Sequence, residues 1–137
     1  MATLDNAPVP IRIRLAALWT SVMFCYIYGD YFELYVPGKV AGLLNGQNLL
    51  DTPWKLLAAT VLLVVPALMI SLSVFLKPAV ARPLHIVVGA FFTLLMLFIA
   101  ATSWSEWRMF YVLLAFIESI LTAVIVWQAL RWPKLTA

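Results

Sequence analysis

"LLAFIESILTAVIVW", residues 113–127, is an apolar stretch with one charged residue, Glu118. It lies within a longer run from about Trp107 to Leu130, close to the roughly 20 residues that a helix needs to cross about 30 Å of hydrocarbon. Three similar runs precede it, at about 13–35, 54–76 and 84–104. The sequence therefore predicts four transmembrane helices.

The composition supports a membrane protein. Of the 137 residues, 65% are hydrophobic and 11% are charged, and the mean hydropathy is +1.01. A soluble domain has about 45–50% apolar and about 25% charged residues. Strand-like alternation is absent, and a backbone in lipid must satisfy its own hydrogen bonds. We therefore expect an all-α, polytopic four-helix bundle, with residues 1–137 forming one transmembrane domain.

The charged residues and the few cysteines and histidines narrow the kinds of partner and ligand that we expect. The net charge is +3, but the nine basic residues are scattered beside the apolar runs and form no basic stripe. This pattern predicts membrane lipids as partners and argues against nucleic acid. The chain has one cysteine and one histidine. We therefore expect no disulfide, no metal site and no cofactor held by several such ligands.

The basic residues also predict an orientation. If the N-terminus lies inside, six basic residues fall on the cytoplasmic side and three on the outer side, which favours both termini in the cytoplasm. The polar, proline-rich start is unlike a signal peptide, so we expect the first helix to be retained. The outer loop 36–53 then contains Val40, Leu43 and Leu44 on one face, which predicts a short interfacial helix.

The connection "KPAVARP" predicts a short inner loop, in which Pro78 marks the end of one helix and Pro83 the start of the next. His85 would then be a solvated residue at the membrane interface. Arg82 satisfies the orientation rule, and its guanidinium is also a candidate contact for a lipid phosphate.

Glu118 is the strongest candidate site residue. Twelve residues separate it from Glu106, which places it about 18 Å deep, near the bilayer midplane. An ionised acid there is costly, so we expect Glu118 to face the bundle interior and to be protonated at neutral pH. Pro66 lies at a similar depth and frees the carbonyl of Leu62. Two readings stay open: a proton or ligand site, or a neutral acid that bonds neighbours such as Thr122.

Three residues of the first helix form a second candidate set. Tyr26, Asp30 and Glu33 are spaced i, i+4, i+7, which places them on one helix face below the outer interface. They could form an acidic, tyrosine-lined entrance that leads towards Glu118. Alternatively, Asp30 and Glu33 are solvated acids that pair with Lys39 or Lys55.

Three stretches resemble an uncharacterised bacterial family of four-helix membrane proteins that is similar to DoxX-like proteins. They are "LWTSVMFCYIYGDYFELYVPG", "VPALMISLSVFL" followed by Arg82, and "FYVLLAFIESILTAVIVWQALRW". The chain departs from the family pattern where Cys25 replaces an Asn and Pro83 replaces a Trp. The resemblance implies the same architecture in the bacterial cytoplasmic membrane, and no known activity. The matching residues are Trp19, Tyr26, Asp30, Pro37, Pro66, Met69, Ser71, Ser73, Arg82, Glu118 and Trp127.

Three function classes remain open. The first is a structural, accessory or small-ligand-binding membrane protein, alone, as a homo-oligomer or within a larger membrane complex. The second is a proton-coupled small transporter or channel that uses Glu118, with Asp30 and Glu33 at its outer entrance. The third is a lipid- or quinone-binding membrane enzyme or subunit. No nucleotide loop or catalytic triad occurs, so we expect no catalytic residues and favour a non-enzymatic role.

Overall fold

The computed structural model describes residues 2–134, and most of these residues are helical. Four helices are long: α1 (Ile11–Glu33), α3 (Pro53–Phe75), α4 (Pro78–Thr102) and α5 (Met109–Leu130). A short helix, α2 (Lys39–Leu44), follows α1, and a 3₁₀ turn, η1 (Glu106–Arg108), precedes α5. The predicted all-α fold, with four long apolar helices and a short helix after the first, is confirmed.

The four long helices have the length and composition of membrane spans. Their outward side chains are large and apolar, whereas a water-soluble bundle would carry polar residues on that face. The bundle therefore presents a surface suited to hydrocarbon. These outward residues include Phe24, Ile27, Leu57, Val61, Phe91, Leu94, Leu113 and Phe116.

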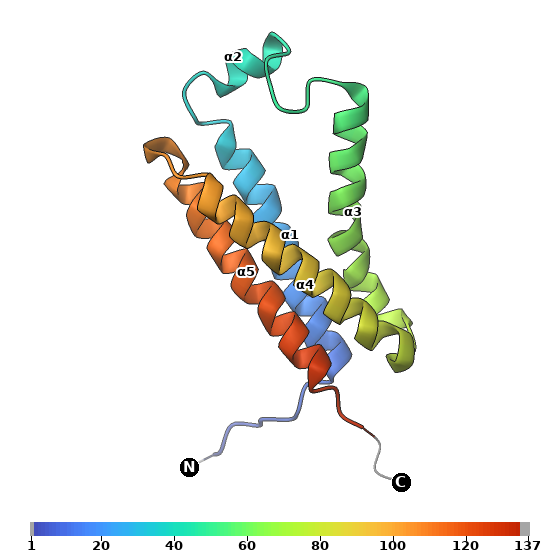
Figure 1. Cartoon of the computed structure of the whole chain (residues 1–137). Helices are drawn as coiled ribbons and strands as arrows, with labels where there is room; N and C mark the ends of the chain where they lie inside the picture. Colours follow the sequence, from blue (N-terminus) through green and yellow to red (C-terminus); the bar gives the residue numbers. More distant parts are fainter. Residues whose placement is uncertain (1, 135–137) are drawn as a thin grey trace.

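The helices run up and down, so both termini lie at one end of the bundle (Figure 1). We call this the terminal end, and the opposite end, which carries residues 34–52 and 103–108, the loop end. Helices α4 and α5 pack along their length, and α1 packs against both α3 and α5. Helix α3 has little contact with α4, and it stands apart from α4 towards the loop end (Figure 1).

Local sequence explains the boundaries at the loop end. Gly38 before α2 and Gly46 after it have φ values of 78° and 70°, a left-handed conformation that glycine adopts without a steric cost. The Thr52 side chain accepts a hydrogen bond from the Lys55 backbone N–H at 3.3 Å, and Pro53 occupies the first turn of α3. These are the residue types that start a helix.

The predicted start of the helix at residue 84 is wrong, because α4 begins at Pro78 and Pro83 lies inside it. Only Leu76 and Lys77 connect α3 to α4. Pro78 fits the first helical position because its missing N–H needs no partner there. The Lys77 carbonyl accepts from the N–H groups of Val80 and Ala81, which closes the first turn. Pro83 leaves one carbonyl, that of Ala79, without its usual helical donor, and the helix continues.

The core at the terminal end is closely packed around Trp19 of α1. Trp19 is fully buried, and its ring meets Phe92 of α4 edge to face, with ring centroids 6.3 Å apart. Leu15, Met69 and Ile125 bring side chains from α1, α3 and α5 into the same cluster. This cluster joins all four long helices near their terminal ends.

The prediction that His85 is solvated is wrong, because the structure buries it completely. Its Nδ1 accepts a hydrogen bond from Trp19 Nε1 at 3.0 Å, and its ring stacks against Trp19 and Trp132. The six extra residues of α4 explain the difference, since they place His85 two turns inside the helix rather than at its start. His85 is therefore a core residue that links α4 to α1.

Candidate functional site

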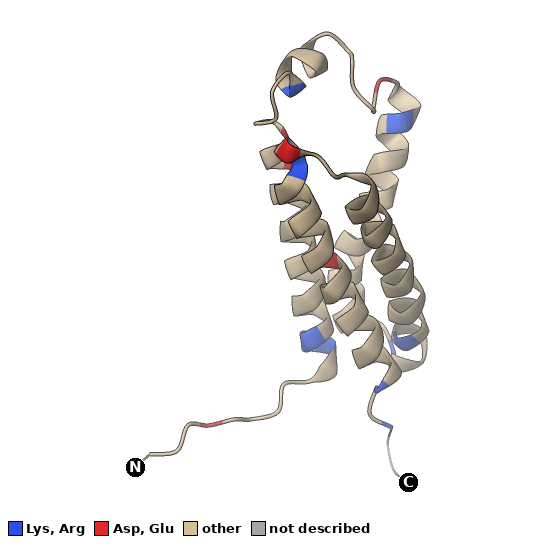
Figure 2. Cartoon of the chain, turned by 60° about the vertical axis from the view of Figure 1, so that its left-hand side comes forward, with Lys and Arg blue, Asp and Glu red and all other residues tan. Residues whose placement is uncertain are grey.

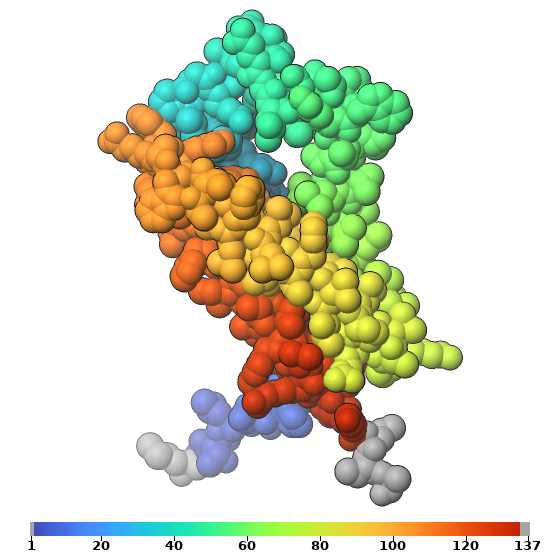
Figure 3. Space-filling view, viewed as in Figure 1, coloured from blue at the N-terminus to red at the C-terminus, as the bar shows by residue number. Residues whose placement is uncertain are grey.

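The half of the bundle towards the loop end contains a cavity of about 260 Å³, which we call the chamber. Figure 3 shows an opening between α3 and the rest of the bundle, below the segment that carries α2. Residues of all four long helices and one residue of the loop line the chamber. They are Tyr26, Gly29, Asp30, Leu49, Ala59, Leu62, Leu63, Met96, Tyr111, Leu114, Ala115 and Glu118.

Glu118 lies inside the bundle, with 4% of its surface exposed. It belongs to the buried face of α5, in which its neighbours Ala115, Ser119 and Thr122 are small. Small side chains let neighbouring helices approach closely. Gly89 also lets α4 pack closely against α5, because a Cβ added at this position would lie 2.8 Å from the Val126 side chain. The close α4–α5 contact holds Glu118 in place beside the chamber.

The hydroxyl groups near Glu118 hydrogen-bond elsewhere. Thr93 Oγ1 of α4 donates to Thr122 Oγ1 at 2.7 Å, and Thr122 Oγ1 donates to the Glu118 backbone carbonyl at 3.0 Å. Ser119 Oγ donates to the Phe116 carbonyl. Among residues 2–134, the Glu118 carboxyl takes part in no side-chain hydrogen bond. The interhelical bond at this level is therefore the one between the two threonines, and the carboxyl is left facing the chamber.

Two tyrosines share the chamber with Glu118. Tyr26 of α1 is 7% exposed, and its hydroxyl is buried without a hydrogen-bond partner in the part of the chain that the structure describes. Its ring packs beside Phe92, with centroids 6.1 Å apart. Tyr111 of α5 lies across Gly29, where an added Cβ would be 3.6 Å from the tyrosine ring. Tyr26 therefore offers a free hydroxyl, and Tyr111 completes the wall between α1 and α5.

Asp30 lies in the chamber wall on the side of the loop end, and its side chain is exposed. Among residues 2–134, Asp30 and Glu118 are the only charged residues that line the chamber. A carboxylate near the opening and a second, buried carboxyl therefore share one mostly apolar cavity. No cation from the described residues pairs with either of them.

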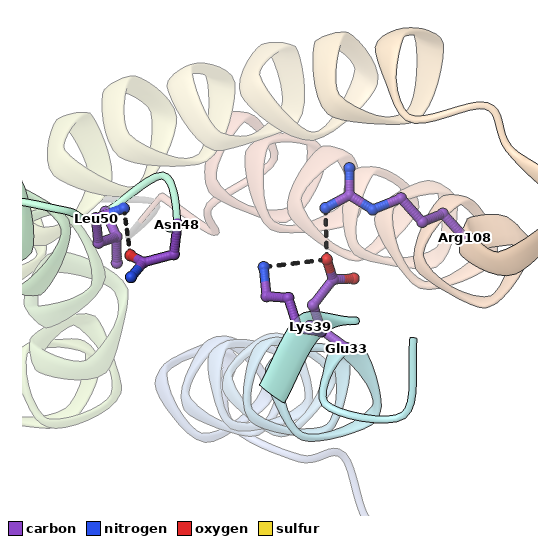
Figure 4. Close-up of polar contacts among 5 residues, drawn as sticks. All are labelled: Glu33, Lys39, Asn48, Leu50 and Arg108. Atoms are coloured by element: carbon purple, nitrogen blue, oxygen red, sulfur yellow. Dashed lines mark hydrogen bonds and ion pairs between the residues drawn. The ribbon is translucent and has the colours of Figure 1, made fainter. Parts of the chain in front are cut away.

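Glu33 instead belongs to an ion-pair cluster next to the chamber. Its Oε1 accepts from Arg108 Nη2 and lies 3.4 Å from Lys39 Nζ (Figure 4). Arg108 also lies over the Tyr111 ring, 5.9 Å from its centroid. The cluster joins α1, α2 and η1. It agrees with the alternative in which Glu33 pairs with Lys39, but Glu33 is buried rather than solvated. It also keeps the two cations engaged outside the chamber.

Lys55, the other cation proposed for Asp30 or Glu33, pairs with Asp51 at 2.6 Å. The hydrogen bond from Lys55 lowers the pKa of the Asp51 carboxyl below its usual range. The exposed pair stabilises the start of α3 only slightly. The basic residues of the loop end are thus all engaged with acids other than Asp30 and Glu118.

The structure brings three of the predicted site residues together, Glu118, Tyr26 and Asp30. It does not bring the others into the chamber lining: Glu33 is in the ion-pair cluster, Thr122 is bonded to Thr93, and Pro66 is buried within α3. Leu62, whose carbonyl Pro66 frees, does line the chamber.

Arg82, the candidate lipid contact, donates from Nε to the Ala129 carbonyl at 3.1 Å and from Nη2 to the Leu130 carbonyl at 3.4 Å. These carbonyls belong to the last turn of α5, where the regular helical pattern of donors ends; the Ala129 carbonyl also accepts from the Trp132 N–H at 3.3 Å. Arg82 therefore caps α5 from α4. This role depends on the close approach of two helix ends and has no signal in the local sequence.

Tyr111 is a chamber residue that sequence reasoning missed. It precedes Glu118 by seven residues, or two helical turns, so both project from the same face of α5. That spacing was a usable signal. Within residues 2–134, no group of three His, Cys, Asp or Glu side chains is placed to hold a metal ion.

The fold and the chamber define a multi-pass membrane protein with four apolar membrane-length helices and a buried acid. Residues 11–137 match the model of a family described as a family of unknown function, DUF6326. The chain belongs to this family. The comparisons with the curated proteins and with the solved structures returned no match. The similarity to DoxX-like proteins stays a prediction.

Proposed function

We propose that the protein binds a small ligand in the chamber, with the Glu118 carboxyl as its main polar contact. The observation that supports this proposal is the buried carboxyl without a hydrogen-bond partner among the described residues, placed beside a cavity rather than against another helix. A buried polar group without a partner costs about 1–3 kcal/mol, and more if it is charged. A ligand or water that bonds Glu118 and Tyr26 would recover part of that cost.

Two adjacent alanines of α3 provide the test. Ala59 lines the chamber, and Ala58 is exposed on the outer surface of the same turn. In a thermal-unfolding screen of small neutral, cationic and anionic compounds, we expect Ala59→Phe to abolish the stabilisation that a bound compound gives to the wild type. A compound at 100 times its Kd stabilises by about 2.7 kcal/mol. Ala58→Phe should keep the full effect. Equal stabilisation of the wild type and both variants would exclude the chamber.

A second candidate function is proton-coupled transport, and the position of Asp30 favours it. Asp30 is exposed near the opening, and Glu118 is buried in the same chamber. A path from water to a midplane acid is what a proton-coupled carrier requires. In proteoliposomes with an internal pH dye, wild-type protein would then carry protons with its substrate and Glu118→Gln would not. Substrate movement without proton movement would exclude the proton coupling, and no substrate movement at all would leave a binding role alone.

We also propose that residues 1–137 form one transmembrane domain in the bacterial cytoplasmic membrane, with both termini in the cytoplasm. Figure 2 shows Lys and Arg at both ends of the bundle. Six lie towards the terminal end and three towards the loop end, which favours the terminal end inside. In a Cys25→Ser background, a membrane-impermeant thiol reagent should label a cysteine at Asn45 and not one at Lys134. The reverse labelling would overturn the orientation. The six are Arg12, Arg14, Lys77, Arg82, Arg131 and Lys134, and the three are Lys39, Lys55 and Arg108.

A further inference from the structure

We propose that the ligand of the chamber is a small organic cation, an ammonium group on an apolar body, whose charge pairs with Glu118. This inference rests on the proposed function and names the chemical class of its ligand. It depends on four features of the chamber: its charge, its groups without partners, its size and its opening.

The chamber is acidic. In the part of the chain that the structure describes, its lining contains Asp30 and Glu118 and no basic side chain. The nearest cations, Arg108 and Lys39, are both engaged with Glu33. An anion in this cavity would be repelled by the Asp30 carboxylate and would find no cation to pair with, since Glu118 is neutral while it is protonated. A cation would meet two carboxyl groups that have no competing partner in the described residues.

Two polar side chains that lack hydrogen-bond partners in the described residues line the chamber, where a ligand could contact them. Tyr26 and Glu118 are both more than nine-tenths buried. The Tyr26 hydroxyl has no hydrogen-bond partner among residues 2–134, and the Glu118 carboxyl takes part in none of the side-chain hydrogen bonds of that region. An ammonium group has several N–H donors, and carboxylate and hydroxyl oxygens both accept them. The aromatic side chains of Tyr26 and Tyr111 add the electron-rich surfaces that bind organic cations.

The rest of the lining excludes a bare metal ion. Most lining residues are apolar, among them Leu62, Leu63, Met96 and Leu114. Calcium takes six to eight oxygen ligands and magnesium takes six, so with two carboxyls most of the ligands would have to be waters held in a mostly apolar cavity. An apolar body, in contrast, gains from burial against these side chains. The cavity of about 260 Å³ is smaller than the roughly 300–1,000 Å³ of a site for a drug-sized molecule. The ligand is therefore small.

The opening gives the cation a route. Helix α3 has little contact with α4, and an opening separates α3 from the rest of the bundle near the loop end (Figure 3). Asp30 is exposed in this part of the chamber wall, and Glu118 lies deeper in the bundle. A cation that entered here would pass from one carboxylate to the other.

Binding would exchange a proton. In the empty chamber the buried Glu118 carries its proton, since the charged form is costly there. When the ammonium binds, the carboxyl O–H bond breaks, the proton leaves to water, and the carboxylate pairs with the ammonium. The titratable groups that share the chamber lining with Glu118 are Tyr26 and Asp30 from α1 and Tyr111 from α5. Cys25 precedes Tyr26 in α1 and lies outside the lining. The lining residues from α3 and α4 are not titratable.

The sign of the pH effect follows from this exchange. Because the complex has lost a proton that the empty protein holds, raising the pH favours the complex. The affinity for the ammonium should rise about tenfold for each pH unit while Glu118 is protonated in the empty protein and the amine is still charged.

The experiment compares 2-phenylethylamine, which is charged at neutral pH, with 2-phenylethanol, a neutral molecule of nearly the same shape. Calorimetry on the full chain in detergent micelles, repeated in buffers of different ionisation heat, gives both affinity and proton release. We expect the amine to bind with release of about one proton. Glu118→Gln should weaken it by about tenfold or more, and the exposed Glu106→Gln should leave it unchanged.

Three outcomes would overturn the inference. If the alcohol binds as tightly as the amine and Ala59→Phe abolishes both, the chamber binds ligands but not as a cation site, and the proposed function stands. If the amine binds equally to the wild type, Ala59→Phe and Glu118→Gln, it binds outside the chamber. If neither compound binds while the thermal screen finds another ligand that Ala59→Phe abolishes, the class is wrong and the chamber remains a binding site. Ala58→Phe checks that a bulky residue on α3 does not itself unfold the protein.

Discussion

The two halves of this bundle are built from the same four helices and differ in what occupies the space between them. Towards the terminal end, Trp19, Phe92 and Ile125 fill the interior, and the Trp19–His85 bond links two helices. Towards the loop end, α3 separates from α4 and leaves a chamber with Glu118 in its wall. The comparison suggests that one half holds the fold together and the other is left open for a ligand.

The largest effect should come from the packed half. Trp19→Ala removes a fully buried ring and leaves His85 Nδ1 without its donor. We expect a loss of about 3–5 kcal/mol in the free energy of unfolding. Phe24→Ala, on the exposed side of the same helix, is the control and should cost well under 1 kcal/mol. Reversible unfolding in mixed micelles measures both, and similar losses for the two would remove the distinction between core and surface.

Alanine substitutions at two glycines compare how closely the two halves are packed. A Cβ at Gly89 would lie 2.8 Å from the Val126 side chain, so Gly89→Ala must push α4 and α5 apart or displace that valine. We expect a loss of about 1–3 kcal/mol. At Gly29, beside the chamber, an added Cβ would meet atoms at 3.5 Å or more. Gly29→Ala should be neutral or stabilise by about 0.5–1 kcal/mol, because alanine favours the helix. A larger loss at Gly29 than at Gly89 would show that the chamber half is the tighter one.

The smallest changes in the free energy of unfolding should come from Thr122→Val and Glu118→Gln. Comparing them distinguishes a hydrogen bond between helices from a contact that only a ligand uses. Thr122→Val removes the bond from Thr93 and should cost about 0.6–1.7 kcal/mol, the range measured for such bonds in membranes. Glu118→Gln should change the free energy of unfolding by less, because the carboxyl has no partner to lose among the described residues. If Glu118→Gln cost more than Thr122→Val in the same unfolding assay, the acid would be part of the packing after all.

Parts of this arrangement could be predicted from the sequence because they depend on local patterns. Run length and composition predict four helices, and the cost of a charge in lipid predicts an inward Glu118. The i, i+4 spacing of Tyr26 and Asp30 correctly groups two residues that line the chamber.

Other parts depend on how helices approach one another, which one sequence does not reveal. The pair of Glu33 and Arg108 joins residues 75 positions apart, and the Arg82 cap on α5 joins residues 47 and 48 apart. The chamber itself results from the separation of α3 and α4. The start of α4 differs from the prediction for another reason. A proline early in a helix removes only one hydrogen bond, so Pro83 lies inside α4 and does not mark its start.

The proposed role of Glu118 requires that it is a protonated acid in a chamber that solvent and ligands can reach. Infrared difference spectra between the wild type and Glu118→Gln isolate the carboxyl C=O band of this residue. We expect a protonated band at neutral pH that shifts promptly on transfer to deuterated water and disappears as the pH is raised. A Glu118 already ionised at pH 7 would contradict the account, and so would a protonated band that neither exchanges nor titrates.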